Sequence, residues 1–216
     1  MDTFSACLAF GPLAIYVMLL GAINLRRRPL VISGTRESLS LGLALVGLAI
    51  VGPMQLFMPE EAATRFGQLV WLLLLAFYVL CLTLIIMLSR PRLIVYNISA
   101  ERLRLALDAA ARRIDADTVW AGRSLSLPLA RVHLHFENFP PLGNVALLAT
   151  SDDQSAVGWR RLETALRETL DETPIAVQTH GFWMLLCGVL MLSALAFWVA
   201  DDPQTIAQGI ERMLRP

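Results

Sequence analysis

The chain has 216 residues, of which 56% are hydrophobic and 17% are charged. Soluble domains carry about a quarter charged residues, so this composition indicates the large uncharged blocks of an integral membrane protein. The 18 basic and 18 acidic residues cancel to a formal net charge of +0, which excludes a bulk electrostatic attraction to nucleic acid. We therefore expect the lipid bilayer as a partner, and no nucleic acid.

Four uncharged blocks are long enough to cross a bilayer, at residues 8–24, 39–58, 68–89 and 181–200. Each is close to the roughly 20 apolar residues that span the hydrocarbon. Backbone polar groups in lipid must be paired within their own segment, so these blocks are predicted to be helices. The chain is accordingly divided into three transmembrane helices at 1–90, a domain at 91–178, a fourth transmembrane helix at 179–200 and a tail at 201–216.

Arginines cluster on one side of these blocks. They are Arg26, Arg27, Arg28 and Arg36 between the first two spans, and Arg90 and Arg92 after the third. The positive-inside rule places segments 25–38 and 91–178 in the cytoplasm and both termini outside. This is the pattern of a multi-pass protein of the plasma (bacterial inner) membrane.

The interiors of the spans lack ionisable side chains. Ion pathways and proton relays nearly always place such groups at membrane depth, so a transporter or pump is disfavoured. Ser40, Ala44 and Gly47 put small side chains on one face of the second span. Such a face allows another helix to approach closely, and we expect packing within the chain rather than a homodimer contact.

Segment 91–178 has the pattern of a small α+β domain. The predicted elements are a strand at 92–99, a helix from Ser99 to Ile114, strands at 118–127, 131–137 and 144–150, a helix at 155–170 and a short strand at 174–178. This order predicts a two-layer α+β sandwich with both helices on one face of a mostly antiparallel sheet. A ferredoxin-like arrangement is the nearest common architecture, and as a fold analogy it carries no function.

The strand at 131–137 contains the strongest candidates for chemistry. Its alternation of apolar residues turns His133, His135 and Glu137 away from the core. These are metal-ligand types, but a metal site needs a third and usually a fourth ligand, and Arg131 beside them repels a cation. We interpret this surface as a solvated polar face and keep a metal or catalytic site as the alternative.

Other motifs of catalysis are missing from the sequence. There is no P-loop and no G-x-G-x-x-G, and Ser124 and Ser126 lack a G-x-S-x-G context. The 3 cysteines lie in apolar runs without metal-ligand spacing, so zinc and structural disulfides are not expected from them. We expect no cofactor.

Two apolar features outside the predicted core are candidates for a partner or membrane contact. In a single strand over 118–127, Trp120 has the parity opposite to Leu125 and so points away from the core. The next candidates lie in a connection where polar turn residues are expected. They are Phe139, Pro140, Pro141 and Leu142. A locally packed loop explains that connection equally well.

The tail at 201–216 starts with Asp202 and Pro203, an N-cap followed by a proline at the first helical position. An amphipathic helix on the outer membrane surface is expected there.

The first functional hypothesis is a non-enzymatic membrane protein whose tethered cytoplasmic domain acts as a scaffold, assembly or sensor module. It would bind a protein partner or a second copy of the chain. One alternative is a membrane-bound enzyme or metal-binding domain that uses His133, His135 and Glu137. Another is a small channel or lipid carrier, which the uncharged spans disfavour.

Overall fold

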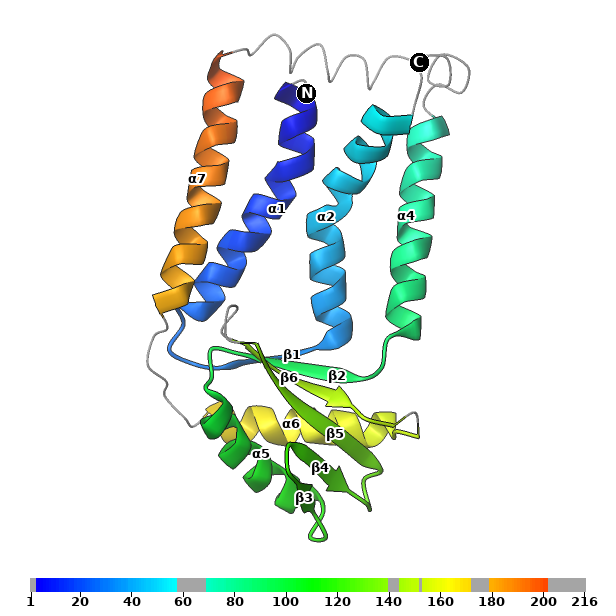
Figure 1. The fold of residues 1–216 in the computed structure, drawn as a ribbon, viewed down its shortest axis with the longest axis vertical. Helices are drawn as coiled ribbons and strands as arrows, with labels where there is room; N and C mark the ends of the chain where they lie inside the picture. Colours follow the sequence, from blue (N-terminus) through cyan, green and yellow to red (C-terminus); the bar gives the residue numbers. More distant parts are fainter. Residues whose placement is uncertain (1–2, 58–68, 140–143, 152, 172–178, 202–216) are drawn as a thin grey trace. The chain divides into compact units, whose positions relative to one another are not determined.

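The computed structural model describes residues 3–57, 69–139, 144–151, 153–171 and 179–201. The chain forms two compact units (Figure 1). The first contains residues 1–19, 38–88 and 184–216, and the second contains residues 20–37 and 89–183. The strand predicted at 174–178 and the helix predicted in the tail lie outside the described residues.

The first unit is built from long apolar helices. They are α1 (Thr3–Asn24), α2 (Gly34–Phe57), α4 (Leu69–Leu88) and α7 (Thr179–Asp201), with the ends of α1, α2 and α7 entering the second unit. Three described stretches are long and apolar enough to cross a membrane, namely Thr3–Asn24, Gly34–Gly52 and His180–Asp201. In α4 the corresponding stretch is the shorter Leu72–Leu88. Helices that are long and apolar enough to cross a membrane are thus confirmed for three of the four predicted blocks.

Glycines allow these helices to approach closely. A side-chain carbon at Gly47 of α2 would lie 1.8 Å from the carbonyl oxygen of Leu8 in α1, so only glycine fits there. At Gly188 of α7 the same carbon would lie 2.4 Å from the side chain of Met18 in α1. At Gly47, the small-residue face predicted for α2 therefore packs against another helix of the same chain, whereas Ser40 of that face is exposed.

The second unit contains a six-stranded sheet in which every neighbouring pair is antiparallel, in the order β1-β2-β6-β5-β4-β3. The strands are β1 (Leu30–Ser33), β2 (Arg92–Tyr96), β3 (Val119–Ala121), β4 (Ser124–Leu127), β5 (Val132–Phe139) and β6 (Asn144–Ala149). Helices α5 (Ala100–Ile114) and α6 (Ala156–Asp171) share one core with it. A mixed domain with an antiparallel sheet is therefore confirmed.

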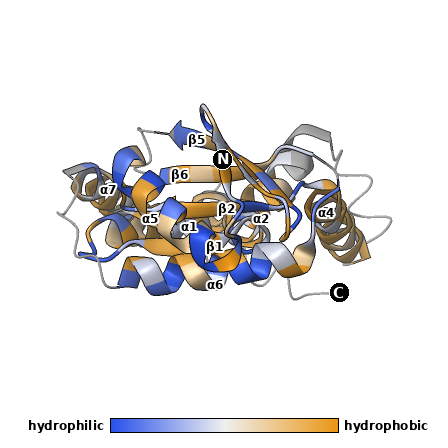
Figure 2. Ribbon diagram, turned by 90° about the horizontal axis from the view of Figure 1, so that it is seen from below, coloured by the Kyte–Doolittle hydropathy of each residue, from blue (hydrophilic) through white to orange (hydrophobic). Residues whose placement is uncertain are grey.

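The core lies between the sheet and these two helices. Cross-strand register places Val31, Val95 and Val145 in one row, and each is at most 5% exposed. The helices contribute stripes with helical spacing, which include Leu107 of α5 and Leu166 of α6, both fully buried. Figure 2 shows that α5 and α6 carry hydrophilic residues alongside their apolar ones, as expected for helices with one solvated side.

The prediction of a single strand at 118–127 is wrong, because this segment forms the hairpin β3–β4. Gly122 has a φ of +63°, and with Arg123 it forms the turn between Ala121 and Ser124. A positive φ at the first turn position is the geometry of tight two-residue hairpins, and glycine adopts it without strain.

The sheet also contains a strand that was not predicted. Residues 30–33, expected only as a loop between two spans, form the edge strand β1 and pair with β2 from Leu30 opposite Tyr96 to Ser33 opposite Leu93. The ferredoxin-like prediction is wrong, because four strands lie between α5 and α6 where that fold has two.

Candidate functional site

The sheet face turned away from α5 and α6 carries two serine–histidine pairs. Ser126 lies opposite His133, and Ser124 lies opposite His135, across β4 and β5. The serine Oγ and histidine Nδ1 atoms are 2.9 Å apart in the first pair and 3.2 Å apart in the second. His133 is half-buried and His135 is exposed, because the intervening Leu134 takes the core side of the strand.

Among the described residues, neither pair has the orienting acid that a nucleophilic serine needs or the third ligand that a metal site needs. A nucleophilic serine requires a histidine base that is itself oriented by an acid. Glu137 is exposed on the same face of the strand, two residues after His135, and it makes no hydrogen bond to either pair. In the described part of the chain, no group of three or more histidine, cysteine, aspartate or glutamate side chains could hold a metal ion. The arrangement offers two imidazoles, fewer than the three protein ligands of catalytic zinc sites.

Gln154 holds the backbone of His133 in place. Its Oε1 accepts hydrogen bonds from the His133 amide at 3.1 Å and from Trp159 Nε1 at 3.0 Å. Its Nε2 donates to the His133 carbonyl at 2.9 Å. The side-chain amide thus bonds to β5 as a neighbouring strand residue would, and it connects the strand to the start of α6.

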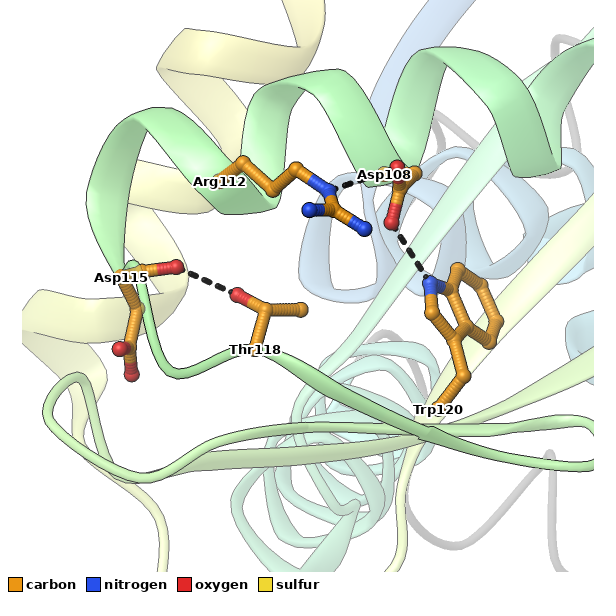
Figure 3. A network of polar contacts seen from close by, with 5 residues as sticks. All are labelled: Asp108, Arg112, Asp115, Thr118 and Trp120. Carbon is orange, nitrogen blue, oxygen red and sulfur yellow. Dashed lines mark hydrogen bonds and ion pairs between the residues drawn. The ribbon is translucent and has the colours of Figure 1, made fainter.

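Trp120 contacts α5, as Figure 3 shows. Its Nε1 donates to Asp108 Oδ1 at 2.9 Å, Arg112 Nε lies 2.9 Å from Asp108 Oδ2, and the Arg104 guanidinium lies 4.8 Å from the ring centroid. The hydrogen bond from Trp120, followed by that from Arg112, lowers the pKa of Asp108 below its ordinary value. The parity prediction for Trp120 is wrong, because the hairpin places it opposite the buried Leu125 on the core side.

A polar cluster joins the start of α2 to β2. Arg92 forms an ion pair with Glu37 at 3.1 Å, and Tyr96 donates a hydrogen bond to Glu37 Oε1 at 3.2 Å. At the end of β2, Asn97 is buried in the left-handed backbone conformation (φ +60°), and its Nδ2 donates to the carbonyl of Arg26. Two of the predicted topology arginines therefore also stabilise the second unit. Arg92 is half-buried, whereas the side chains of the other five are exposed, namely Arg26, Arg27, Arg28, Arg36 and Arg90.

The predicted apolar contact after β5 is only partly within the described residues. Phe139 is the last residue of β5. Pro140, Pro141 and Leu142 lie outside the described residues, so a contact at this connection stays a prediction.

A groove of about 500 Å³ lies between the end of α5 and α6. Ile114, Val157 and Ala165 give it an apolar floor, and the charged residues around them are Arg113, Arg160, Arg161 and Glu168. A concave surface with an apolar floor and a few charged groups is the usual form of a binding site. Among the described residues, this groove therefore combines an apolar surface with charged groups that could bind a ligand.

None of the groove arginines was predicted as a site residue. Each lies on the solvated side of an amphipathic helix, where charged side chains are ordinary. The sequence does contain one indication that Arg160 and Arg161 are available to a ligand. The positions four residues away from each on the helix carry no carboxylate that could form an ion pair. Their proximity to Arg113 depends on the packing of α5 against α6.

Comparisons of the chain with protein-family models, with curated proteins and with solved structures gave no match.

Proposed function

We propose that this chain is a four-span membrane protein of the plasma (bacterial inner) membrane whose cytoplasmic domain docks a protein partner as a scaffold, assembly or sensor module. The observation that carries the proposal is the direct continuation of sheet strands into apolar helices. β1 ends at Ser33 and α2 begins at Gly34, and three residues separate the end of α4 from β2. Connections of no more than three residues therefore join the sheet to each of these two helices.

The shared sheet also supports the proposed topology. The segment with Arg26, Arg27 and Arg28 contributes β1, and the segment with Arg90 and Arg92 contributes β2. Strands that exchange backbone hydrogen bonds must lie on the same side of a membrane. The two arginine clusters then act together under the positive-inside rule, which favours the cytoplasm for both and the outside for both termini.

The experiment that tests this function is affinity purification from native membranes in mild detergent. The full chain is compared with a version that lacks residues 93–178, after membrane extraction shows that both versions are inserted. We expect a stoichiometric partner with the full chain and its loss with the shortened chain. Equal recovery of the same partner with both versions would contradict a docking role for the domain.

The two histidine side chains of these pairs suggest one second candidate, a metal-binding domain. If Nδ1 of each imidazole donates to its serine, both Nε2 atoms are free of that contact and available as ligands. Zinc bound in stoichiometric amount and lost in His135→Ala, without a change in unfolding temperature, would support this candidate. Purified full chain without such zinc would leave the docking proposal as the better account.

A further inference from the structure

We propose that the groove between α5 and α6 binds an acidic peptide segment of a partner protein, with an apolar side chain of the peptide on the groove floor and its carboxylates on the arginines. This inference rests on the proposed function, since it names the surface and the partner chemistry of the docking domain.

The floor of the groove is apolar and open to solvent. Val157 is 59% exposed, although it belongs to a helix whose other large aliphatic residues form the buried stripe. Ile114 and Ala165 are half-buried beside it. An exposed apolar surface bordered by charged groups is typical of a protein contact, and an aliphatic side chain placed there would remove it from water.

The arginines around the floor differ from others on the same two helices. On α5, Arg112 pairs with Asp108 at 2.9 Å, and on α6, Arg167 pairs with Glu163 at 2.5 Å, each through helical i,i+4 spacing. The described residues provide no ion-pair partner within 4.0 Å for the three groove arginines. These are Arg113, Arg160 and Arg161.

Sequence spacing explains this difference. Four positions before and after Arg160 lie Ala156 and Thr164, and the corresponding neighbours of Arg161 are Val157 and Ala165. Neither arginine therefore has a carboxylate four positions away, the spacing of the other pairs. Glu163 lies three positions after Arg160, but it is paired with Arg167. The groove is lined by three guanidinium groups and one carboxylate, that of Glu168. Its net positive charge is complementary to the carboxylates of a ligand, which arginine binds through two parallel hydrogen bonds.

The residues that line the site favour a peptide over a lipid surface. Apolar and arginine side chains line the same groove of about 500 Å³. An acidic peptide with an aliphatic side chain contacts both kinds of residue, whereas lipid head groups match the arginines alone. Clusters of arginine that read acidic motifs are a known mode of peptide recognition.

The test uses the full chain in phosphatidylcholine nanodiscs and a fluorescein-labelled peptide that alternates glutamate with leucine. The matched probe has glutamine in place of every glutamate. We expect binding of the acidic peptide by fluorescence anisotropy, weakened roughly ten-fold in the double variant Arg160→Gln, Arg161→Gln, because each charged hydrogen bond contributes strongly. Binding should also weaken as salt is raised.

Two matched controls separate the groove from general surface effects. Arg102→Gln removes an exposed arginine of α5 that does not line the groove, and it should leave the affinity within about two-fold. Val157→Ala should weaken binding several-fold. Val119 has the same exposed fraction of 59% outside the groove, so Val119→Ala should have no effect. Unchanged unfolding temperatures show that the variants are folded.

Three results would overturn the inference. They are equal binding of the glutamate and glutamine peptides, insensitivity of binding to the groove arginines, and arginine-dependent binding to phosphatidylglycerol vesicles without binding of the acidic peptide. If the native partner is recovered equally by the double arginine variant and is lost with residues 93–178, the groove inference fails while the docking function stands. Recovery without residues 93–178 would contradict the docking function itself.

Discussion

Val31 lies opposite Val95 across β1 and β2, so a residue that follows the first apolar helix shares a sheet row with one that follows α4. Val31 is 5% exposed, and its carbonyl accepts a hydrogen bond from Arg167 of α6 at 3.2 Å. The loop between the first two apolar helices is therefore a structural part of the second unit.

A charge at position 31 should unfold this unit. We expect Val31→Asp to lower the free energy of unfolding by more than about 3 kcal/mol, since it buries an unpaired carboxylate in an apolar core. Limited proteolysis of the full chain in detergent would measure this as rapid cleavage between residues 93 and 171. Leu129→Ala is the control, because Leu129 is 74% exposed, and protease resistance of Val31→Asp equal to wild type would show that β1 is dispensable.

The stability of the first unit should depend on Gly47, where α2 lies close to α1. Gly47→Ala should destabilise the helices by about 1–3 kcal/mol, because the new methyl group would enter the backbone of α1. Gly11→Ala is the matched control, since nothing lies within 4 Å of the carbon added there. Thermal unfolding followed by size-exclusion chromatography in detergent compares the two, and equal midpoints would rule out close α1–α2 contact at Gly47.

The side chain of Gln154 should contribute more to the free energy of unfolding than its half-buried position suggests. Gln154→Ala removes two hydrogen bonds to the backbone of His133 and one from Trp159, and we expect a loss of about 1–3 kcal/mol. Chemical denaturation of the full chain, followed by tryptophan fluorescence, would measure it. Ser151→Ala removes only the hydrogen bond from Gln154 Nε2 to Ser151 Oγ, so it should lower the free energy of unfolding by less. A larger loss in Ser151→Ala than in Gln154→Ala would contradict this role for Gln154.

The Asp108–Trp120 contact predicts a dependence of stability on pH. The pKa of Asp108 is lowered in the folded chain, mainly by the hydrogen bond from Trp120 and next by that from Arg112. The pKa of Asp108 in the unfolded chain is about 3.8, so at pH values above this the ionised carboxylate stabilises the fold. This contribution is lost as the pH falls through the lower pKa of the folded chain. Because the group is at the surface, the effect should be small.

Trp120→Phe isolates this effect, since it retains an aromatic ring and removes the donor. We expect the pKa of Asp108, measured by carboxyl NMR titration, to rise toward its ordinary value in the variant. The stability difference between Asp108→Asn and wild type should shrink as the pH falls below about 3.8. An unchanged titration of Asp108 in Trp120→Phe would show that the indole does not hold the carboxylate.

Local patterns were sufficient to predict much of this fold. The apolar stripes of α5 and α6 and the alternation in β5 and β6 follow from residues close together in the sequence, and both appear in the structure. The placement of His133 and His135 away from the core also followed from that alternation, because Leu134 between them is fully buried.

The remaining features depend on contacts between distant segments. β1 has only four residues and gains its strand partner from β2, far along the chain, and so short an apolar run does not by itself identify a strand. A prediction of the β3–β4 hairpin would have required Gly122 to be recognised as a turn residue. A single glycine within a strand pattern can equally mark a bulge, so the sequence left this ambiguous. The groove required the end of α5 to lie beside α6, a relationship that no local pattern contains.

The central claim is that residues 25–38 and the domain at 91–178 form one cytoplasmic unit on membrane-spanning helices. Single cysteines at Arg27 and Asp153, in a chain with its three native cysteines replaced by serine, test it by labelling intact cells with a membrane-impermeant maleimide. Both positions should be protected until the cells are permeabilised, while a cysteine at Ala62, in the predicted outer segment, should be labelled at once. Labelling of Arg27→Cys or Asp153→Cys in intact cells would contradict the proposed orientation, and labelling of one with protection of the other would also contradict the shared sheet.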